Sequence, residues 1–124
     1  MVKNQLHLLL SFDIIIESMV NVGTGMKVIQ KETKEKEIVV VDFYANWCGP
    51  CKMLTPILEQ LEEKTKGEVE IYKVDVDDNP ELCGQFNITS IPTLLFFKNG
   101  KLIFKELGFR SLDYLMEIIT KVKE

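Results

Sequence analysis

The most informative stretch of the sequence is Val39-Val40-Val41-Asp42-Phe43-Tyr44-Ala45-Asn46-Trp47-Cys48-Gly49-Pro50-Cys51-Lys52. It begins as an apolar, β-branched run, which is typical of a buried strand. Two cysteines separated by a Gly-Pro pair follow, and beyond them apolar residues recur at helical spacing. The predicted order is therefore a buried strand, a short loop, a Cys-x-x-Cys motif and a helix.

The two cysteines of this motif are placed for redox chemistry. With two residues between them, Cys48 and Cys51 can close a small disulfide ring. At a helix start, the first sulfur lies near unpaired backbone N–H groups and the positive end of the helix dipole, which favour the reactive thiolate. The second sulfur lies about one turn inside the helix and is more shielded. We therefore expect Cys48 to attack a disulfide and Cys51 to resolve the resulting mixed disulfide.

A zinc site is the main alternative use of such a motif. A structural zinc site needs about four ligands. The other candidate ligands are Cys83 and His7, and neither belongs to a second Cys-x-x-Cys motif or a histidine pair. We therefore expect a redox pair without a metal, and we expect Cys83 to be a buried structural thiol rather than a regulatory one.

The composition is that of a soluble globular protein. The chain has 124 residues, of which 46% are hydrophobic and 27% charged, enough for one domain with a proper core. A net charge of −4 without a block of Lys or Arg argues against a nucleic-acid partner. Three cysteines are too few for a secreted disulfide scaffold, so a cytoplasmic redox protein is expected.

The first 25 residues fit no single interpretation. The apolar run from Leu6 to Ile16 lacks the basic start and cleavage site of a signal peptide, and its length and charges do not suit a membrane span. Residues 1–25 are either an element packed on the domain or a poorly integrated extension, which includes a misassigned start. We expect the domain itself to occupy residues 26–124, after the breaker Gly23-Thr24-Gly25.

Local signals place the remaining elements along the chain. The predicted ranges are a strand at 39–43, a helix at 48–66, a strand at 68–76, a short helix capped by Asn79, strands at 93–98 and 101–107, and a last helix capped by Ser111. The apolar face predicted for the long helix consists of Met53, Leu54, Ile57, Leu58 and Leu61.

Several spaced motifs resemble the thioredoxin family. Trp-Cys-Gly-Pro-Cys-Lys at 47–52 is followed by Asp77-Asp78-Asn79-Pro80, Ile91-Pro92-Thr93 and Phe97-Lys98-Asn99-Gly100-Lys101. The resemblance covers about residues 26–124, with residues 26–30 as a first strand. It implies an α/β thioredoxin fold, whose central mixed sheet of four to five strands has the order 1-3-2-4-5 and carries helices on both faces.

The resemblance also implies an activity. It is that of a thiol-disulfide oxidoreductase that reduces disulfides of client proteins at Cys48 and Cys51 and is regenerated by thioredoxin reductase. The Gly-Pro pair between the cysteines resembles the reducing members of the family. We expect a monomer with no bound cofactor and no membrane partner. The alternative is a non-catalytic docking or scaffold module that uses the same apolar rim.

Asp42 lies in an otherwise apolar run, where a charge is costly unless it is paired. The side chain either turns to solvent or is buried, and burial would raise its pKa and make it a usable proton acceptor. The resemblance implies the buried role, in which Asp42 helps to deprotonate Cys51 and Lys73 is its partner.

The resemblance further implies an apolar rim that binds clients. The residues assigned to this rim are Trp47, Gly49, Pro50, Ile91, Pro92, Leu107 and Gly108. A cis bond before Pro92 would turn the Ile91 backbone outward to pair with an extended client segment. The sequence leaves open a trans proline at a strand edge and a tryptophan that belongs to the core.

Overall fold

The computed structural model describes residues 38–124, in which four strands form one mixed sheet of order β2-β1-β3-β4. The strands are β1 (Ile38–Tyr44), β2 (Val69–Asp75), β3 (Thr93–Lys98) and β4 (Lys101–Leu107). β1 pairs in parallel with β2, whereas the β1–β3 and β3–β4 pairs are antiparallel. The predicted mixed sheet is confirmed. The strand predicted at residues 26–30, like residues 1–25, lies outside the described residues.

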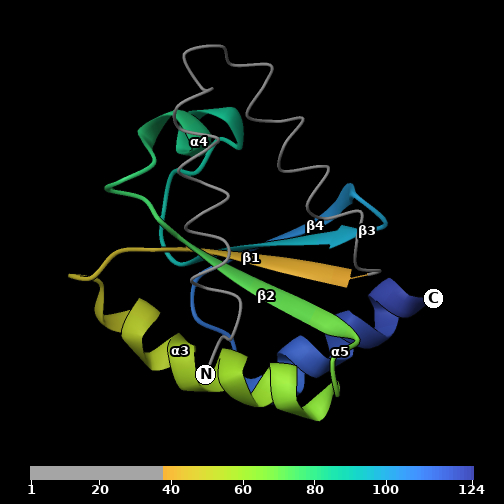
Figure 1. Cartoon of the computed structure of the whole chain (residues 1–124). Helices are drawn as coiled ribbons and strands as arrows, with labels where there is room; N and C mark the ends of the chain where they lie inside the picture. The colour runs from red at the N-terminus through yellow and green to blue at the C-terminus, as the bar shows by residue number, and fades with distance from the viewer. Residues whose placement is uncertain (1–37) are drawn as a thin grey trace.

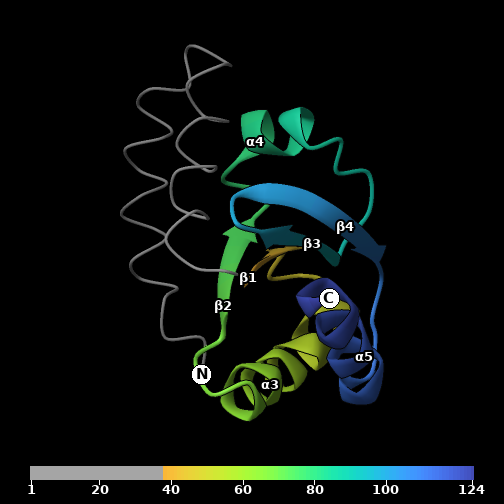
Figure 2. The same ribbon diagram turned by 90° about the vertical axis from the view of Figure 1, so that its right-hand side faces the viewer.

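Helices cover both faces of the sheet, as predicted. α3 (Gly49–Lys64) and α5 (Leu112–Lys123) lie against one face, and the short α4 (Pro80–Gln85) lies on the other (Figures 1 and 2). β1 is buried on both faces, which explains its continuous apolar run. Ile38 and Val40 join the core under α3 and α5, and Val39, Val41 and Phe43 join the core under α4.

Two element boundaries lie where the local sequence predicted them, and one predicted helix cap is absent. Asn99 and Gly100 both have positive φ, 51° and 81°, as a tight hairpin between β3 and β4 requires. The Ser111 hydroxyl accepts a hydrogen bond from the Tyr114 N–H and so caps α5. Asn79 precedes α4 but does not cap it through its side chain. Its amide instead donates to the Asp75 carbonyl at 2.8 Å, which ties the loop back to β2.

The predicted buried face of α3 is wrong at one position. Met53 is 61% exposed, because it lies off the row formed by Cys51, Leu54 and Leu58, which are the residues that face the sheet. On α5, the buried residues are Leu115, Ile118, Ile119 and Val122. The spacing of apolar residues predicts the buried face of a helix only approximately, because the elements packed against the helix determine how wide that face is.

Candidate active site

The cysteine pair lies where the chain leaves β1 and enters α3. A disulfide joins Cys48 and Cys51, and Cys48 occupies the N-cap position of the helix. The Cys51 backbone N–H donates to the Cys48 sulfur at 3.2 Å. In the reduced protein, a donor in this position stabilises a thiolate, in addition to the helix dipole. Both residues are buried in this oxidised form, with Cys48 5% and Cys51 2% exposed.

Trp47 is a surface residue beside the disulfide, so the core alternative for it is wrong. Its side chain is 70% exposed, and its indole N–H donates to an Asp77 carboxylate oxygen at 2.9 Å. Asp77 is itself held in place, because its backbone N–H donates to the Asp75 side chain at 2.9 Å. Sequence reasoning placed Asp77 in a family motif but gave it no role. The structure shows that it orients the tryptophan ring.

The proline segment lies against the cysteine pair. The Ile91–Pro92 peptide bond is cis, and Ile91 packs with Cys48 and Cys51 in a small apolar cluster. The Pro92 carbonyl accepts a hydrogen bond from the Gly108 N–H at 2.8 Å. This bond brings the end of β4 to the same corner, where Leu107 is exposed. The structure therefore brings the predicted rim residues together around the disulfide.

A groove begins at the exposed tryptophan and runs beside α4. It has a volume of about 680 Å³, and its lining includes Trp47, Val76, Cys83, Ile88 and Ile91. Cys83 is a free thiol that is half-buried, not fully buried as predicted. Its burial and the nearby carboxylates of two aspartates raise its pKa. Cys83 is therefore a poor source of thiolate compared with a cysteine at a helix start.

Asp42 lies in β1, the strand that leads to the cysteine pair, and is completely buried, so the alternative in which it turns to solvent is wrong. Its exposed fraction is 0%, and neither carboxylate oxygen has a hydrogen-bond partner among the described residues. Burial raises its pKa from 3.8 to about 7, and the charge of Lys73 opposes this rise only in part. A carboxyl group with this pKa exchanges protons readily near neutral pH.

Lys73 is next to Asp42 in the register of the parallel β1–β2 pair. Its ammonium does not hydrogen-bond to that carboxylate. It donates instead to the Thr55 hydroxyl at 2.9 Å and lies 4.5 Å from the centre of the Tyr44 ring. Sequence reasoning missed Thr55, because nothing in the local pattern of α3 connects it with a lysine on a neighbouring strand.

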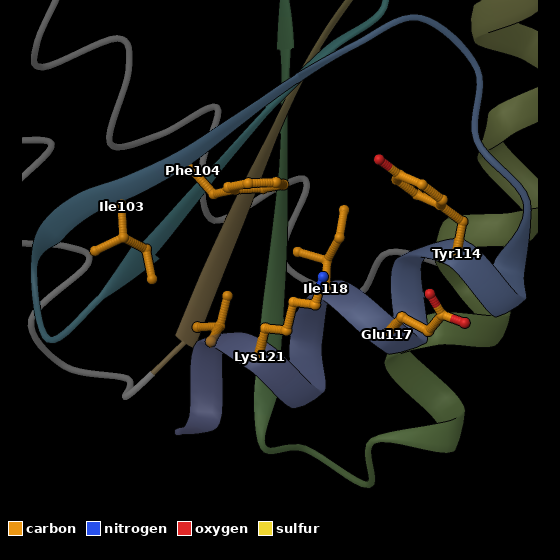
Figure 3. Close-up of a pocket in the computed structure, with 7 residues that line it drawn as sticks. Ile103, Phe104, Tyr114, Glu117, Ile118 and Lys121 are labelled. Carbon is orange, nitrogen blue, oxygen red and sulfur yellow. The ribbon is translucent and has the colours of Figure 1, made fainter.

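A second cavity is separate from this corner. It has a volume of about 240 Å³ and lies between β4 and α5, where Ile103 and Phe104 face Tyr114 and Ile118 (Figure 3). None of the predicted site residues lines it.

Within residues 38–124, no cluster of three or more His, Cys, Asp or Glu side chains could hold a metal ion. No helix in this described part is long and apolar enough to cross a membrane.

A disulfide that spans the N-cap and the first turn of a helix, beside an exposed tryptophan, is suited to exchange with other thiols and disulfides. These features define the class of dithiol-disulfide oxidoreductases.

Comparison with known proteins identifies the family within that class. The thioredoxin family model matches residues 24–121. The chain is 42% identical to thioredoxin from Rickettsia felis over 93 residues, which cover 74% of this chain and 89% of the relative. It is 43% identical to Bacillus subtilis thioredoxin over 90 residues, 73% of this chain and 86% of that one.

A solved structure agrees with these relatives. A mutant thioredoxin from Halobacterium salinarum superposes with a TM-score of 0.73 at 35% identity, covering 79% of this chain and 85% of that chain. The chain therefore belongs to the thioredoxin family, and it is a protein-disulfide reductase with a redox-active cysteine pair. The predicted family, fold and activity are confirmed.

Proposed function

We propose that Cys48 attacks the disulfides of client proteins and that Cys51 resolves the mixed disulfide. In the first step, the Cys48 thiolate forms a bond to one client sulfur, and the other client sulfur leaves as a thiolate. In the second step, the Cys51 thiolate attacks the Cys48 sulfur, which closes the internal disulfide and releases the second client thiolate. Two electrons thereby pass from the chain to the client.

The position of Cys48 at the start of α3 is the observation that carries this assignment. Its sulfur accepts the Cys51 N–H, so the thiolate of Cys48 is the one that the helix stabilises. Cys51 lies inside the first turn, and among residues 38–124 no comparable donor reaches its sulfur. Cys48 is therefore the better nucleophile at neutral pH, and Cys51 needs help to lose its proton.

Asp42 supplies that help in our proposal. Its carboxyl group is buried, and its pKa of about 7 makes it both a proton acceptor and a proton donor near neutral pH. A cavity of about 120 Å³ lies next to Cys51 and is lined by Tyr44, Thr55 and Lys73 among others. This volume is sufficient for water beside Cys51 and Lys73, and such water would carry the proton toward Asp42, which does not line the cavity but is the register partner of Lys73.

The client segment would bind along the apolar rim around the disulfide. The exposed Trp47 ring, the exposed start of α3 at Gly49 and Pro50, and the exposed Leu107 offer apolar contact area. Ile91 lies next to the cysteine pair, and its backbone would pair with an extended client segment as an added strand. This arrangement suits proteins with accessible disulfides rather than one particular sequence.

The proposal also covers the source of electrons, the oligomeric state and the cellular location of the protein. We propose that a thioredoxin reductase returns two electrons to the Cys48–Cys51 disulfide after each cycle. The protein would act as a monomer in the cytoplasm, and residues 26–124 would form the functional domain. Support for the range of the domain comes from the family match at residues 24–121.

Replacement of Cys51 by serine tests the two-step exchange. The Cys51→Ser chain should accumulate a mixed disulfide between Cys48 and a client such as oxidised insulin, because no thiol remains to resolve it. Cys48→Ser is the matched control and should form no such adduct. Turnover of Cys51→Ser at the unaltered rate would refute the mechanism. A docking module, in contrast, would keep its function when both cysteines are serine.

A further inference from the structure

Lys73 lies beside Asp42 but is bound to other groups. The two residues are register partners on adjacent parallel strands, and Lys73 is nine-tenths buried. Its ammonium donates to the Thr55 hydroxyl at 2.9 Å and lies over the Tyr44 ring, while both Asp42 oxygens lack hydrogen-bond partners. A buried carboxylate would ordinarily attract a neighbouring ammonium. A contact with another residue must therefore hold the Lys73 ammonium away from the Asp42 carboxylate.

Thr55 is the residue that can do so. It lies one helical turn after Cys51, and its hydroxyl hydrogen-bonds to the Cys51 carbonyl at 3.3 Å. The same hydroxyl accepts the hydrogen bond from Lys73, so it links the lysine to the helix turn that carries the resolving cysteine. The hydroxyl donates its hydrogen to the Cys51 carbonyl and accepts a hydrogen bond from Lys73, so its orientation is fixed.

We propose that Thr55 is a positioning residue that holds the Lys73 ammonium away from Asp42 and so leaves this carboxyl group free to exchange a proton with Cys51. The inference rests on the role proposed for Asp42 as the proton acceptor. Thr55 itself touches neither the client nor the sulfur atoms. It acts through Lys73.

The other charged groups near Asp42 do not replace Lys73. Across the sheet, the register row continues from Asp42 through Leu94 to Glu106 on β4. Glu106 is two strand spacings away, about 10 Å, and is already paired with Arg110 at 2.8 Å.

The described helices supply no further buried cation to this region, since the part-buried charged residues of α3, Glu59 and Glu62, are acidic. On α3, Lys52 borders the cavity next to Cys51 but is exposed, and Cys51 does not titrate while the disulfide is closed. α5 faces the sheet mainly with apolar side chains, and its Tyr114 hydroxyl donates to Glu106. Lys73 is therefore the cation that matters for Asp42.

The size of the expected effect follows from the alternative position of the lysine. An ion pair with a nearby cation lowers the pKa of an acid by about 1–3 units. Burial keeps the pKa of Asp42 high in the present arrangement, and the charge of Lys73 lowers it only in part. Release of the ammonium toward the unpartnered oxygens would strengthen this lowering.

The test uses the full-length oxidised chain, in which the cysteine pair does not titrate. The Asp42 carboxyl carbon is followed by NMR against pH in Thr55→Val, which removes the hydroxyl and keeps the shape, and in Thr55→Ser, which keeps the hydroxyl. We expect Thr55→Val to lower the Asp42 pKa by about one unit, a tenfold change in ionisation constant. Thr55→Ser should titrate like the unaltered chain. An unchanged or higher pKa in Thr55→Val would overturn the proposal.

A double-variant cycle shows whether the effect passes through the lysine. In a Lys73→Met background, Thr55→Val should no longer change the Asp42 pKa, because there is no ammonium to release. A shift of the same size in that background would mean that Thr55 acts on Asp42 by another route, and the proposal would be wrong.

The rate of disulfide reduction separates this proposal from the one on which it rests. In Thr55→Val, the acid limb of the pH–rate profile should move to lower pH together with the Asp42 pKa. If the NMR pKa moves and the rate profile does not, Thr55 positions Lys73 as proposed, and the role of Asp42 as proton acceptor is wrong. If neither moves, the positioning role of Thr55 is wrong.

Discussion

Replacement of Asp42 by alanine should stabilise the folded chain above neutral pH and slow its reaction at the same time. The folded-state pKa of Asp42 is raised from 3.8 to about 7, so the folded chain keeps a proton that the unfolded chain has lost between these values. Stability therefore falls as the pH rises from about 4 to about 7 and is constant above that range. The loss amounts to about 4 kcal/mol, since one pKa unit corresponds to about 1.4 kcal/mol.

The alanine variant escapes this loss but leaves a small cavity, which costs about 1–2 kcal/mol. We therefore expect Asp42→Ala to be more stable than the unaltered chain by about 2–3 kcal/mol at pH 8.5 and not more stable at pH 4. Urea unfolding of both oxidised chains at the two pH values measures the difference. A gap that does not change with pH would refute the reasoning, because only the ionisation of Asp42 makes it pH-dependent.

The turnover rate of Asp42→Ala tests the role of Asp42 in the resolving step. Without Asp42, Cys51 loses its proton acceptor, so turnover near pH 7 should fall on the order of tenfold or more. The deficit should shrink at high pH, where Cys51 ionises unaided. Full activity of a destabilised variant at every pH would make Asp42 a structural partner of Lys73 instead.

Two further predictions concern the cysteines and the first residues of the chain. Limiting iodoacetamide near neutral pH should label Cys48 of the reduced protein before Cys51, because the start of α3 stabilises its thiolate; peptide mass mapping would reveal the opposite order. A chain that begins at Met26 should keep its reductase activity in an insulin-reduction assay, because every proposed site residue lies downstream. Loss of activity in a shortened chain that still folds would show that residues 1–25 contribute to the site, and thermal melting of both chains checks the folding.

Features that depend on neighbouring residues were predictable from the sequence. The hairpin at Asn99-Gly100 and the cap at Ser111 follow from backbone preferences of single residues, and both lie where they were expected. The cysteine pair at the start of α3 belongs to the same group, because two intervening residues suffice to define it.

Features that depend on packing did not follow from the local sequence pattern; the family resemblance implied some of them, such as the burial of Asp42, but not the hydrogen bond between Lys73 and Thr55. Burial of Asp42 requires helices that cover its face of the sheet, and the hydrogen bond from Lys73 joins residues 18 positions apart. The exposure of Trp47 depends on a bond to Asp77, 30 positions away. In each case residues elsewhere in the fold set the direction of the side chain, and the local sequence does not identify those residues.

The central place of β1 determines how the site responds to local opening of the fold. This strand pairs on both sides and is buried on both faces, whereas most side chains of β4 are exposed. Segments with few buried contacts open at low free energy, and central strands open only when the whole domain unfolds. β1 carries Asp42 and leads directly into Cys48, so the reactive groups belong to the segment that opens last. Fraying along β4 can therefore expose backbone there while the cysteines and the buried carboxyl group keep their relative positions.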